Sequence, residues 1–241
     1  MNIEVFKSLM GKEWVEMFAP FIKSKEMDSI YSFLKKESNN RKIICPKSKN
    51  TYRTFKTTDP KSLKIVWVFQ DPYSKVIGNN MVADGVALSC RNTGYSQPSL
   101  RAFFDYIRNN IEQGDKDFEE DYNLDYLCDQ GVLMLNSALT VEKDKPGSHT
   151  HIWNPFIEYF IKEILNKKYN GLITVFSGSN AKLFSPFVDQ NLHYVFHTEH
   201  PASAVRNNRE WRGNDIFNVI NSILTKNNRT EWINWTGGLP F

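Results

Sequence analysis

The segment that most constrains this chain is an uninterrupted apolar run, Ile65–Phe69, followed directly by the polar tetrapeptide Gln70-Asp71-Pro72-Tyr73. Five apolar residues that end at a proline turn are typical of a strand buried on both faces of a parallel sheet. Pro72 fixes its own φ and disfavours helical geometry at Asp71, so the carboxylate is held on a stiff turn. Ligands of open α/β sheets bind beyond the carboxyl ends of the strands. The segment therefore predicts a strand and a site next to it.

Apolar runs and amphipathic segments alternate along the rest of the chain. We expect further strands at Val132–Leu135, Leu172–Phe176 and His193–Phe196. We expect helices over 11–37 (two pieces meeting near Ser24-Lys25), from Pro98 to about 113, over 153–167 and over 213–225. This alternation predicts a three-layer αβα fold with a central four-stranded, mainly parallel sheet. A length of 241 residues fits one domain, with N-terminal helices and a basic connector over 1–60 and a core over 61–235.

Polar residues follow each expected strand at the point where its apolar run ends. They are Gln70-Asp71, Asn136, Ser177-Gly178-Ser179 and His200. The carboxyl ends of parallel strands meet at one edge of a sheet, so we expect these residues to form one site.

Charge is unevenly distributed although the formal net charge is only +3. Eight basic residues lie between Arg41 and Lys64, against Asp59 alone, whereas seven acidic residues lie between Glu112 and Asp125. Such a chain could present one basic face that orients on a polyanion. Two solvated loops are an equally good interpretation of the same pattern.

The cysteines and the N-terminus bear on the compartment. Cys45, Cys90 and Cys128 are odd in number and widely spaced, which argues against a disulfide framework or a zinc site. No secretory signal is evident at the N-terminus, and no apolar run approaches the roughly 20 residues of a membrane span. We therefore predict a cytoplasmic or other intracellular protein that is not bound to a membrane.

Several separated motifs resemble those of the family-1 uracil-DNA glycosylases, in that family's order and spacing, over about residues 60–235. The matching segments are Gln70-Asp71-Pro72-Tyr73, Gly85-Val86-Ala87-Leu88-Ser89, Pro98-Ser99, Leu133–Val141 with Asn136, Gly178-Ser179 and His200–Val205. Each segment taken singly has an ordinary structural explanation as a turn, a strand cap or a loop. Their joint placement makes the resemblance specific.

The resemblance implies hydrolysis of the N-glycosidic bond of deoxyuridine in DNA, which releases uracil and leaves an abasic site for base excision repair. Asp71 would face the positive charge of the sugar and position water, and neutral His200 would donate a hydrogen bond to uracil O2. The amide of Asn136 matches uracil O4 and N3–H, and the bulk of Tyr73 excludes the thymine methyl. Gln70 and Leu88 complete the expected uracil-binding set, and Ser99, Ser179 and Ser203 the set that grips DNA phosphates.

Some positions depart from the family pattern. Ser74 stands in place of a histidine, Leu88 in place of a phenylalanine, and the loop between Asp71 and Leu88 is long. Ala204 occupies the position of a leucine wedge that fills the space of the flipped base, with Val205 beside it. Because the methyl of alanine cannot fill that space, we expect a preference for single-stranded DNA. Val205 or Arg206 acting as the wedge in a shifted loop is the competing interpretation.

The expected partner is uracil-containing DNA, single- or double-stranded, bound by a monomer, and a proteinaceous inhibitor of uracil-DNA glycosylases is a further candidate. No metal or cofactor is expected, because three dispersed cysteines cannot ligate the iron–sulfur cluster of related glycosylases. The alternative function is a DNA-binding accessory or processivity protein of replication that keeps the fold and has secondary activity. The changed wedge and Leu88 keep that alternative open.

Overall fold

A four-stranded sheet of order β5-β2-β7-β8 forms the centre of the computed structural model, which describes residues 2–112, 114–226 and 232–237. Its strands are β2 Ile65–Phe69, β5 Val132–Asn136, β7 Ile173–Ser177 and β8 Tyr194–Thr198. All three neighbouring pairs are parallel, which confirms the predicted sheet. β2, β5 and β7 are buried along their whole length, as their continuous apolar runs predicted, whereas the edge strand β8 is partly exposed.

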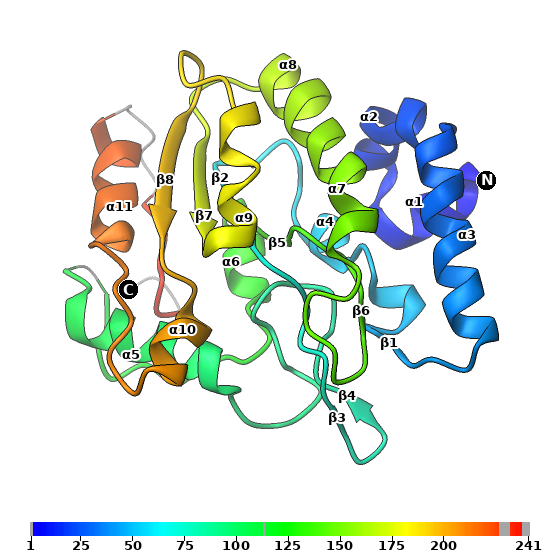
Figure 1. Ribbon diagram of the computed structural model, residues 1–241. Coiled ribbons are helices and arrows are strands. Elements are labelled where there is room, and N and C mark those ends of the chain that lie inside the picture. The colour runs from blue at the N-terminus through cyan, green and yellow to red at the C-terminus, as the bar shows by residue number, and fades with distance from the viewer. Residues whose placement is uncertain (1, 113, 227–231, 238–241) are drawn as a thin grey trace.

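The register of the sheet brings the strand carboxyl ends to one edge. Phe69 at the end of β2 pairs with Asn136 at the end of β5, and Ser177 at the end of β7 pairs with Thr198 of β8. The residues that follow these positions therefore emerge side by side, at the lower end of the sheet in Figure 1.

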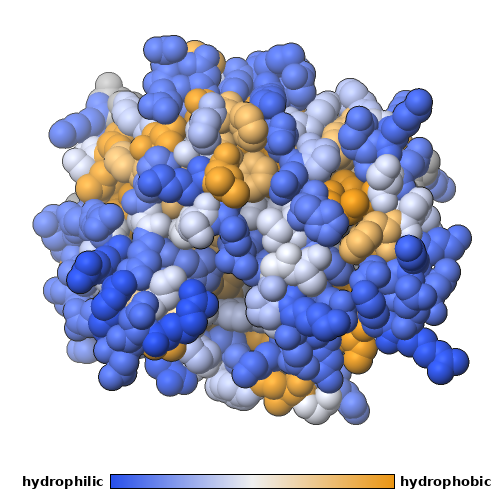
Figure 2. Space-filling view, in the orientation of Figure 1, coloured by the Kyte–Doolittle hydropathy of each residue, from blue (hydrophilic) through white to orange (hydrophobic). Residues whose placement is uncertain are grey.

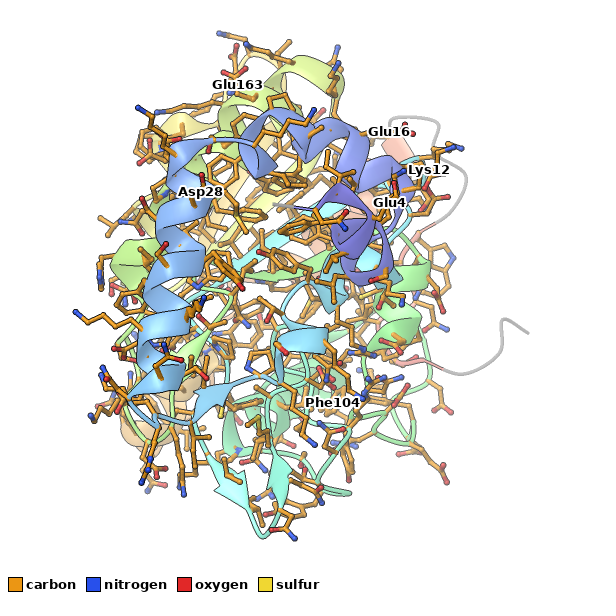
Figure 3. The ribbon with its side chains drawn as sticks, turned by 90° about the vertical axis from the view of Figure 1, so that its right-hand side faces the viewer. Glu4, Lys12, Glu16, Asp28, Phe104 and Glu163 are labelled. Carbon is orange, nitrogen blue, oxygen red and sulfur yellow. The ribbon has the colours of Figure 1, made fainter. Side chains whose placement is uncertain are left out.

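One helical layer covers the face of the sheet that presents Val66 and Val68. It contains α1 Ile3–Met10, α2 Lys12–Ile22, α3 Lys25–Asn39, α7 Thr150–Tyr159, the π-helical turn η2 Phe160–Leu165, α8 Asn166–Lys168 and α9 Ser179–Lys182. Figure 3 views this layer from α1, α2 and α3, where the charged side chains of Glu4, Lys12 and Asp28 lie on the outer surface. The break between α2 and α3 falls at the predicted position, because Ser24 caps α3 by accepting from the Met27 N–H.

The second layer covers the opposite face, which presents Ile65, Trp67 and Phe69. It contains α5 Pro98–Asn110, α6 Asp125–Asp129, α10 Pro201–Arg206 and α11 Ile216–Lys226. Layers therefore lie on both faces of the sheet (Figure 1), which confirms the three-layer architecture. The helix predicted to run from Pro98 to about 113 ends at Asn110, and residue 113 lies outside the described residues.

Short elements that the sequence analysis left as loop surround the edge where the strands end. They are β1 Ile44–Cys45 paired with β6 Val141–Glu142, the turn η1 Ser48–Asn50, α4 Arg53–Thr57, and the hairpin of β3 Val76–Ile77 and β4 Asn80–Met81. The turn η3 Ser185–Phe187, also left as loop, lies next to α8, where the Asn166 amide donates to the Phe187 carbonyl. The helix α1 was also missed. None of the described helices has the length and apolar character needed to cross a lipid bilayer.

The basic and acidic stretches are joined by one buried ion pair. Arg53 is buried and forms ion pairs with Asp84 and Asp125, and Asp125 belongs to the acidic stretch. Lys42, which is partly exposed, pairs with Glu37 and Glu142, outside that stretch. Arg53 is therefore withdrawn from the surface, and a basic face formed by the remaining cations stays a prediction.

Candidate active site

A cavity of about 330 Å³ lies beyond the carboxyl ends of β2 and β5. It is lined by eight of the residues that the sequence analysis selected: Gln70, Asp71, Tyr73, Leu88, Ser99, Asn136, His200 and Val205. These residues come from five separate parts of the chain: 70–73, Leu88, Ser99, Asn136 and 200–205. The parallel register explains why they meet, since it aligns the ends of the strands that carry them.

Asp71 is fixed from the loop before α7. The Gly147 N–H donates to Asp71 Oδ2 at 2.5 Å, so one carboxylate oxygen is anchored. Burial raises the pKa of Asp71 above its ordinary value, and the hydrogen bonds from Gly147 and Gln70 oppose that rise. A carboxylate that is short of solvation gains more than an exposed one from a nearby positive charge.

His200 is held in one tautomer as the N-cap residue of α10. The Ala202 N–H donates to His200 Nδ1 at 3.1 Å, so a neutral ring carries its proton on Nε2. Burial, together with the positive charge of Arg206, lowers the pKa of His200 to about 4. A Cβ at Gly178 would lie 2.9 Å from His200 Cβ, so the loop after β7 needs glycine to approach the ring. At neutral pH His200 is therefore a neutral hydrogen-bond donor through Nε2.

Asn136 presents a polar group that the protein itself leaves unsatisfied. Asn136 is 7% exposed, and its side-chain amide has no hydrogen-bond partner among the described residues. A nearly buried amide without a partner in the wall of a cavity indicates a polar ligand. Tyr73 lines the same cavity, but its hydroxyl is buried next to Ser99 and the Leu100 N–H, and burial raises its pKa.

The loop that carries Leu88 is built around a buried carboxylate that the sequence analysis missed. Asp84 is fully buried and accepts hydrogen bonds from Ser89 Oγ (2.5 Å) and the Val86 N–H (3.1 Å), while Arg53 Nη1 lies 3.1 Å away. This bracing holds Leu88 at a φ of 64°, which is unusual for a bulky residue. The Asp84-Gly85 dipeptide was the available turn signal, whereas Arg53 was indistinguishable from a solvated cation.

Of the three serines predicted to contact DNA phosphates, one lines the cavity and two do not. Ser99 lines the cavity in the first turn of α5, next to the positive end of that helix dipole. Ser179 and Ser203 do not line the cavity; Ser179 is exposed, and Ser203 Oγ accepts from Arg206 at 3.1 Å. The lining also includes Lys75 and Gln97, which the sequence analysis did not select, and Arg206, which it named only as a competing wedge residue.

The two residues of the predicted wedge region differ in their exposure to solvent. Ala204 has no exposed surface and packs in the core beneath α10, in the same cluster as Trp211. Val205 is 41% exposed and stands at the rim of the cavity. A side chain without exposed surface cannot enter a base stack, so the assignment of the wedge position to Ala204 is not compatible with this structure.

Residues 55–225 match the model of a protein family described as the uracil DNA glycosylase superfamily. This match spans well over half of the chain. The chain belongs to the uracil-DNA glycosylase superfamily. It is 31% identical to the uracil-DNA glycosylase of Acinetobacter baylyi, over 95% of this chain and 93% of that protein. It is 33% identical to that of Buchnera aphidicola subsp. Acyrthosiphon pisum, over 92% of this chain and 97% of that protein.

Solved structures agree with this assignment at the level of the fold. The crystal structure of mimivirus uracil-DNA glycosylase has a TM-score of 0.84 at 24% identity, covering 98% of this chain and 89% of that one. A variant of the mimivirus protein, solved in complex with UGI, has a TM-score of 0.81 at the same identity, covering 98% of this chain and 91% of that one. The three-layer architecture described above is thus the fold of these superfamily members.

Proposed function

We propose that this protein is a family-1 uracil-DNA glycosylase, which hydrolyses the N-glycosidic bond of deoxyuridine in DNA and releases uracil. The observation that carries the proposal is the joint placement of Asp71, Asn136 and His200 around one cavity of about 330 Å³. Membership of the superfamily and the intact Gln70-Asp71-Pro72-Tyr73 segment support it.

The two catalytic groups act on opposite charges of the breaking bond. Cleavage of the bond between C1′ and uracil N1 gives the sugar oxocarbenium character and leaves the electron pair on uracil. Asp71 faces the cationic sugar and accepts the proton of the water that attacks C1′. His200 Nε2–H donates to uracil O2, where negative charge develops. Neutral His200 suits this role because its proton remains on the imidazole while it stabilises the uracil anion.

Specificity for uracil follows from the amide of Asn136 and from the bulk of Tyr73. The amide of Asn136 accepts from uracil N3–H and donates to O4, while cytosine presents the reverse pattern and leaves buried groups unpaired. Tyr73 occupies the space beside C5 and excludes the methyl of thymine. Leu88 provides apolar contact to the base, and Gln70 contacts it through the backbone.

Ser99 grips a phosphate beside the flipped nucleotide, with Ser179 and Ser203 as more distant contacts that close on bound DNA. We assign the wedge to Val205, because it is the exposed apolar side chain at the rim of the cavity. We further propose that a UGI-like inhibitor competes with DNA for this surface. The protein would act as a monomer inside the cell, where its three buried free cysteines stay reduced.

The decisive experiment is release of free uracil from a single-stranded oligonucleotide in the presence of EDTA. Matched oligonucleotides with cytosine or thymine at the same position are the specificity controls. We expect release from the uracil oligonucleotide only, and strongly reduced release by an Asp71→Asn variant. A protein that bound the oligonucleotide but released nothing would instead be the DNA-binding accessory protein, which no feature of the cavity favours.

A further inference from the structure

A second hollow, of about 470 Å³, adjoins the candidate active site and takes no part in the chemistry proposed above. Helix α5 forms one wall, and the segment 205–211 forms the other. Pro98 and Val205 line both hollows, so Val205 forms a ridge between them. We call this second hollow the α5 groove. When one nucleotide of a DNA strand enters the cavity, the neighbouring part of that strand lies next to the α5 groove, on the other side of Val205.

The wall contributed by α5 is a single polar face of an amphipathic helix. Arg101, Asp105 and Arg108 recur at spacings of four and three residues and line the groove. The opposite face of α5 is buried in the core. The polar lining also includes three amide side chains, Asn109, Asn110 and Asn208, and the side chains of Tyr106, Arg209 and Glu210. The surface over α5 and α10, at the lower left of Figure 2, is correspondingly hydrophilic.

Among the described residues that line the α5 groove, Arg101 is the arginine without a carboxylate partner, and two carboxylates, Asp105 and Glu210, also line the groove. Arg209 forms a bidentate ion pair with Glu199, and Arg108 Nη1 lies 3.0 Å from Glu120 Oε1. Arg101, by contrast, is exposed, and its guanidinium contacts only the Ser96 carbonyl, at 3.5 Å, among the described residues. A guanidinium with unused donors matches the oxygens of a phosphate.

The far wall is rigid, although it is irregular in conformation. Trp211 Nε1 donates to the Glu199 carbonyl at 2.6 Å, and the Asp215 N–H donates to Tyr106 Oη at 2.8 Å. A Cβ at Gly213 would lie 2.8 Å from the Tyr106 ring, so the segment packs directly on α5. The α5 groove is therefore formed before any ligand arrives, which lowers the cost of binding.

We propose that the α5 groove binds the phosphate backbone of the uracil-containing strand, one or two nucleotides from the excised base, with Arg101 as the phosphate contact. The inference rests on the proposed function for the identity of the strand. Backbone suits the groove better than a stacked base, because Trp211 is 3% exposed and offers no open aromatic face. The volume of the groove exceeds that of the cavity proposed for the flipped nucleotide.

The test is a length series of single-stranded oligonucleotides that extend from uracil by one to four nucleotides on the 5′ side only or on the 3′ side only. Wild-type kcat/KM should rise with extension on one side and then level off. Arg101→Gln should lower kcat/KM about fivefold to tenfold for substrates extended on that side and leave the shortest substrate unchanged. For Arg101→Gln, the slope of log affinity against log salt concentration should be smaller in magnitude by about 0.7 than for the wild type. Arg101→Lys, which keeps the charge, should recover part of the loss.

Lys35→Gln, which removes one exposed charge from the remote helix α3, is the matched control and should change none of these values. An equal effect of Arg101→Gln at every length, or no effect, would overturn the proposal. An effect confined to duplex substrates would also overturn it, since the complementary strand would then be the ligand. Fluorescence anisotropy with uracil-free oligonucleotides of the same lengths separates the two proposals. Length-dependent weakening by Arg101→Gln without any uracil release from the wild type would refute only the proposed function.

Discussion

Substitutions at Val205 and Ala204, the two neighbouring residues of the predicted wedge region, should change different properties. Substitution of Val205 should change the rate on duplex DNA, and substitution of Ala204 should change stability. Val205 is 41% exposed at the rim of the cavity, whereas Ala204 has no exposed surface. Val205→Ala removes two carbons from a side chain that we propose enters the base stack. At about 0.8 kcal/mol for each carbon withdrawn from water, the loss is about 1.5 kcal/mol, or roughly tenfold in single-turnover rate. The loss should occur on duplex DNA alone, because a single strand has no stack to fill.

Ala204→Leu should act on stability instead of on strand preference. Three additional carbons in a packed core cost about 1–3 kcal/mol, which lowers the melting temperature by about 2–4 °C for each kcal/mol in a protein of this size. Ala202→Ser, on the same helix but lining the cavity, is the control and should melt as the wild type does.

The assays are single-turnover uracil release from matched single- and double-stranded substrates, and thermal unfolding of each variant. Because valine is smaller than leucine, wild-type protein should still favour single-stranded DNA. An Ala204→Leu variant with unchanged melting temperature and faster duplex cleavage would refute the reasoning. Equal losses on both substrates in Val205→Ala would refute the wedge assignment.

Three further predictions concern the catalytic and uracil-binding groups. Asp71→Asn should lower single-turnover uracil release by about 10²–10⁴ while binding, measured by anisotropy, stays near wild type, because the charge acts mainly in the transition state. The proposed mechanism needs ionised Asp71 and neutral His200, so kcat/KM should fall as pH drops through the raised pKa of Asp71 and through the His200 pKa of about 4. The residual activity of Asp71→Asn, which lacks the first titration, should fall only near pH 4, and an acid limb near pH 6.5 in that variant would contradict the proposed state of His200. Asn136→Asp should release measurable cytosine from a cytosine-containing oligonucleotide, since a protonated carboxyl can pair where the amide cannot, and absence of cytosine release with residual uracil release would contradict the assigned contact.

The sheet could be predicted because its signal is local and strong. The runs predicted as strands at Ile65–Phe69, Val132–Leu135 and Leu172–Phe176 cover β2, β5 and β7 except for Asn136 and Ser177 at the strand ends, and all three strands are buried at every position. Parallel pairing then placed Asp71 and Asn136 together without further information. The two-residue strands and short helices around the site had no comparable signal, because each is too short to show a period.

The sequence alone did not decide between Ala204 and Val205 as the proposed wedge, and it did not show the bracing of the loop that carries Leu88, for two different reasons. A motif match fixes the position of Ala204 in the chain but not the direction of its side chain on the short helix α10, which places Ala204 inward and Val205 outward. Arg53 lay in a run of basic residues, where a solvated cation is the ordinary expectation. Only the tertiary structure shows its contact with Asp84, 31 residues away along the chain.

The opposite pKa shifts of Asp71 and His200 have one common cause with a catalytic consequence. Burial in the same cavity disfavours the charged form of both groups, raising the pKa of the carboxyl and lowering that of the imidazole. A protonated His200 would neutralise Asp71 before any substrate arrived, so the low pKa of His200 preserves the field of the carboxylate. In the reaction that we propose, positive charge develops on the sugar near Asp71 and negative charge on the uracil near His200 Nε2–H. In the free protein the buried carboxylate of Asp71 forms no ion pair with any of the described residues. In the proposed transition state, the cationic sugar faces Asp71 and the anionic uracil faces the His200 N–H. The site therefore stabilises the transition state more than the ground state, which is the condition for electrostatic catalysis.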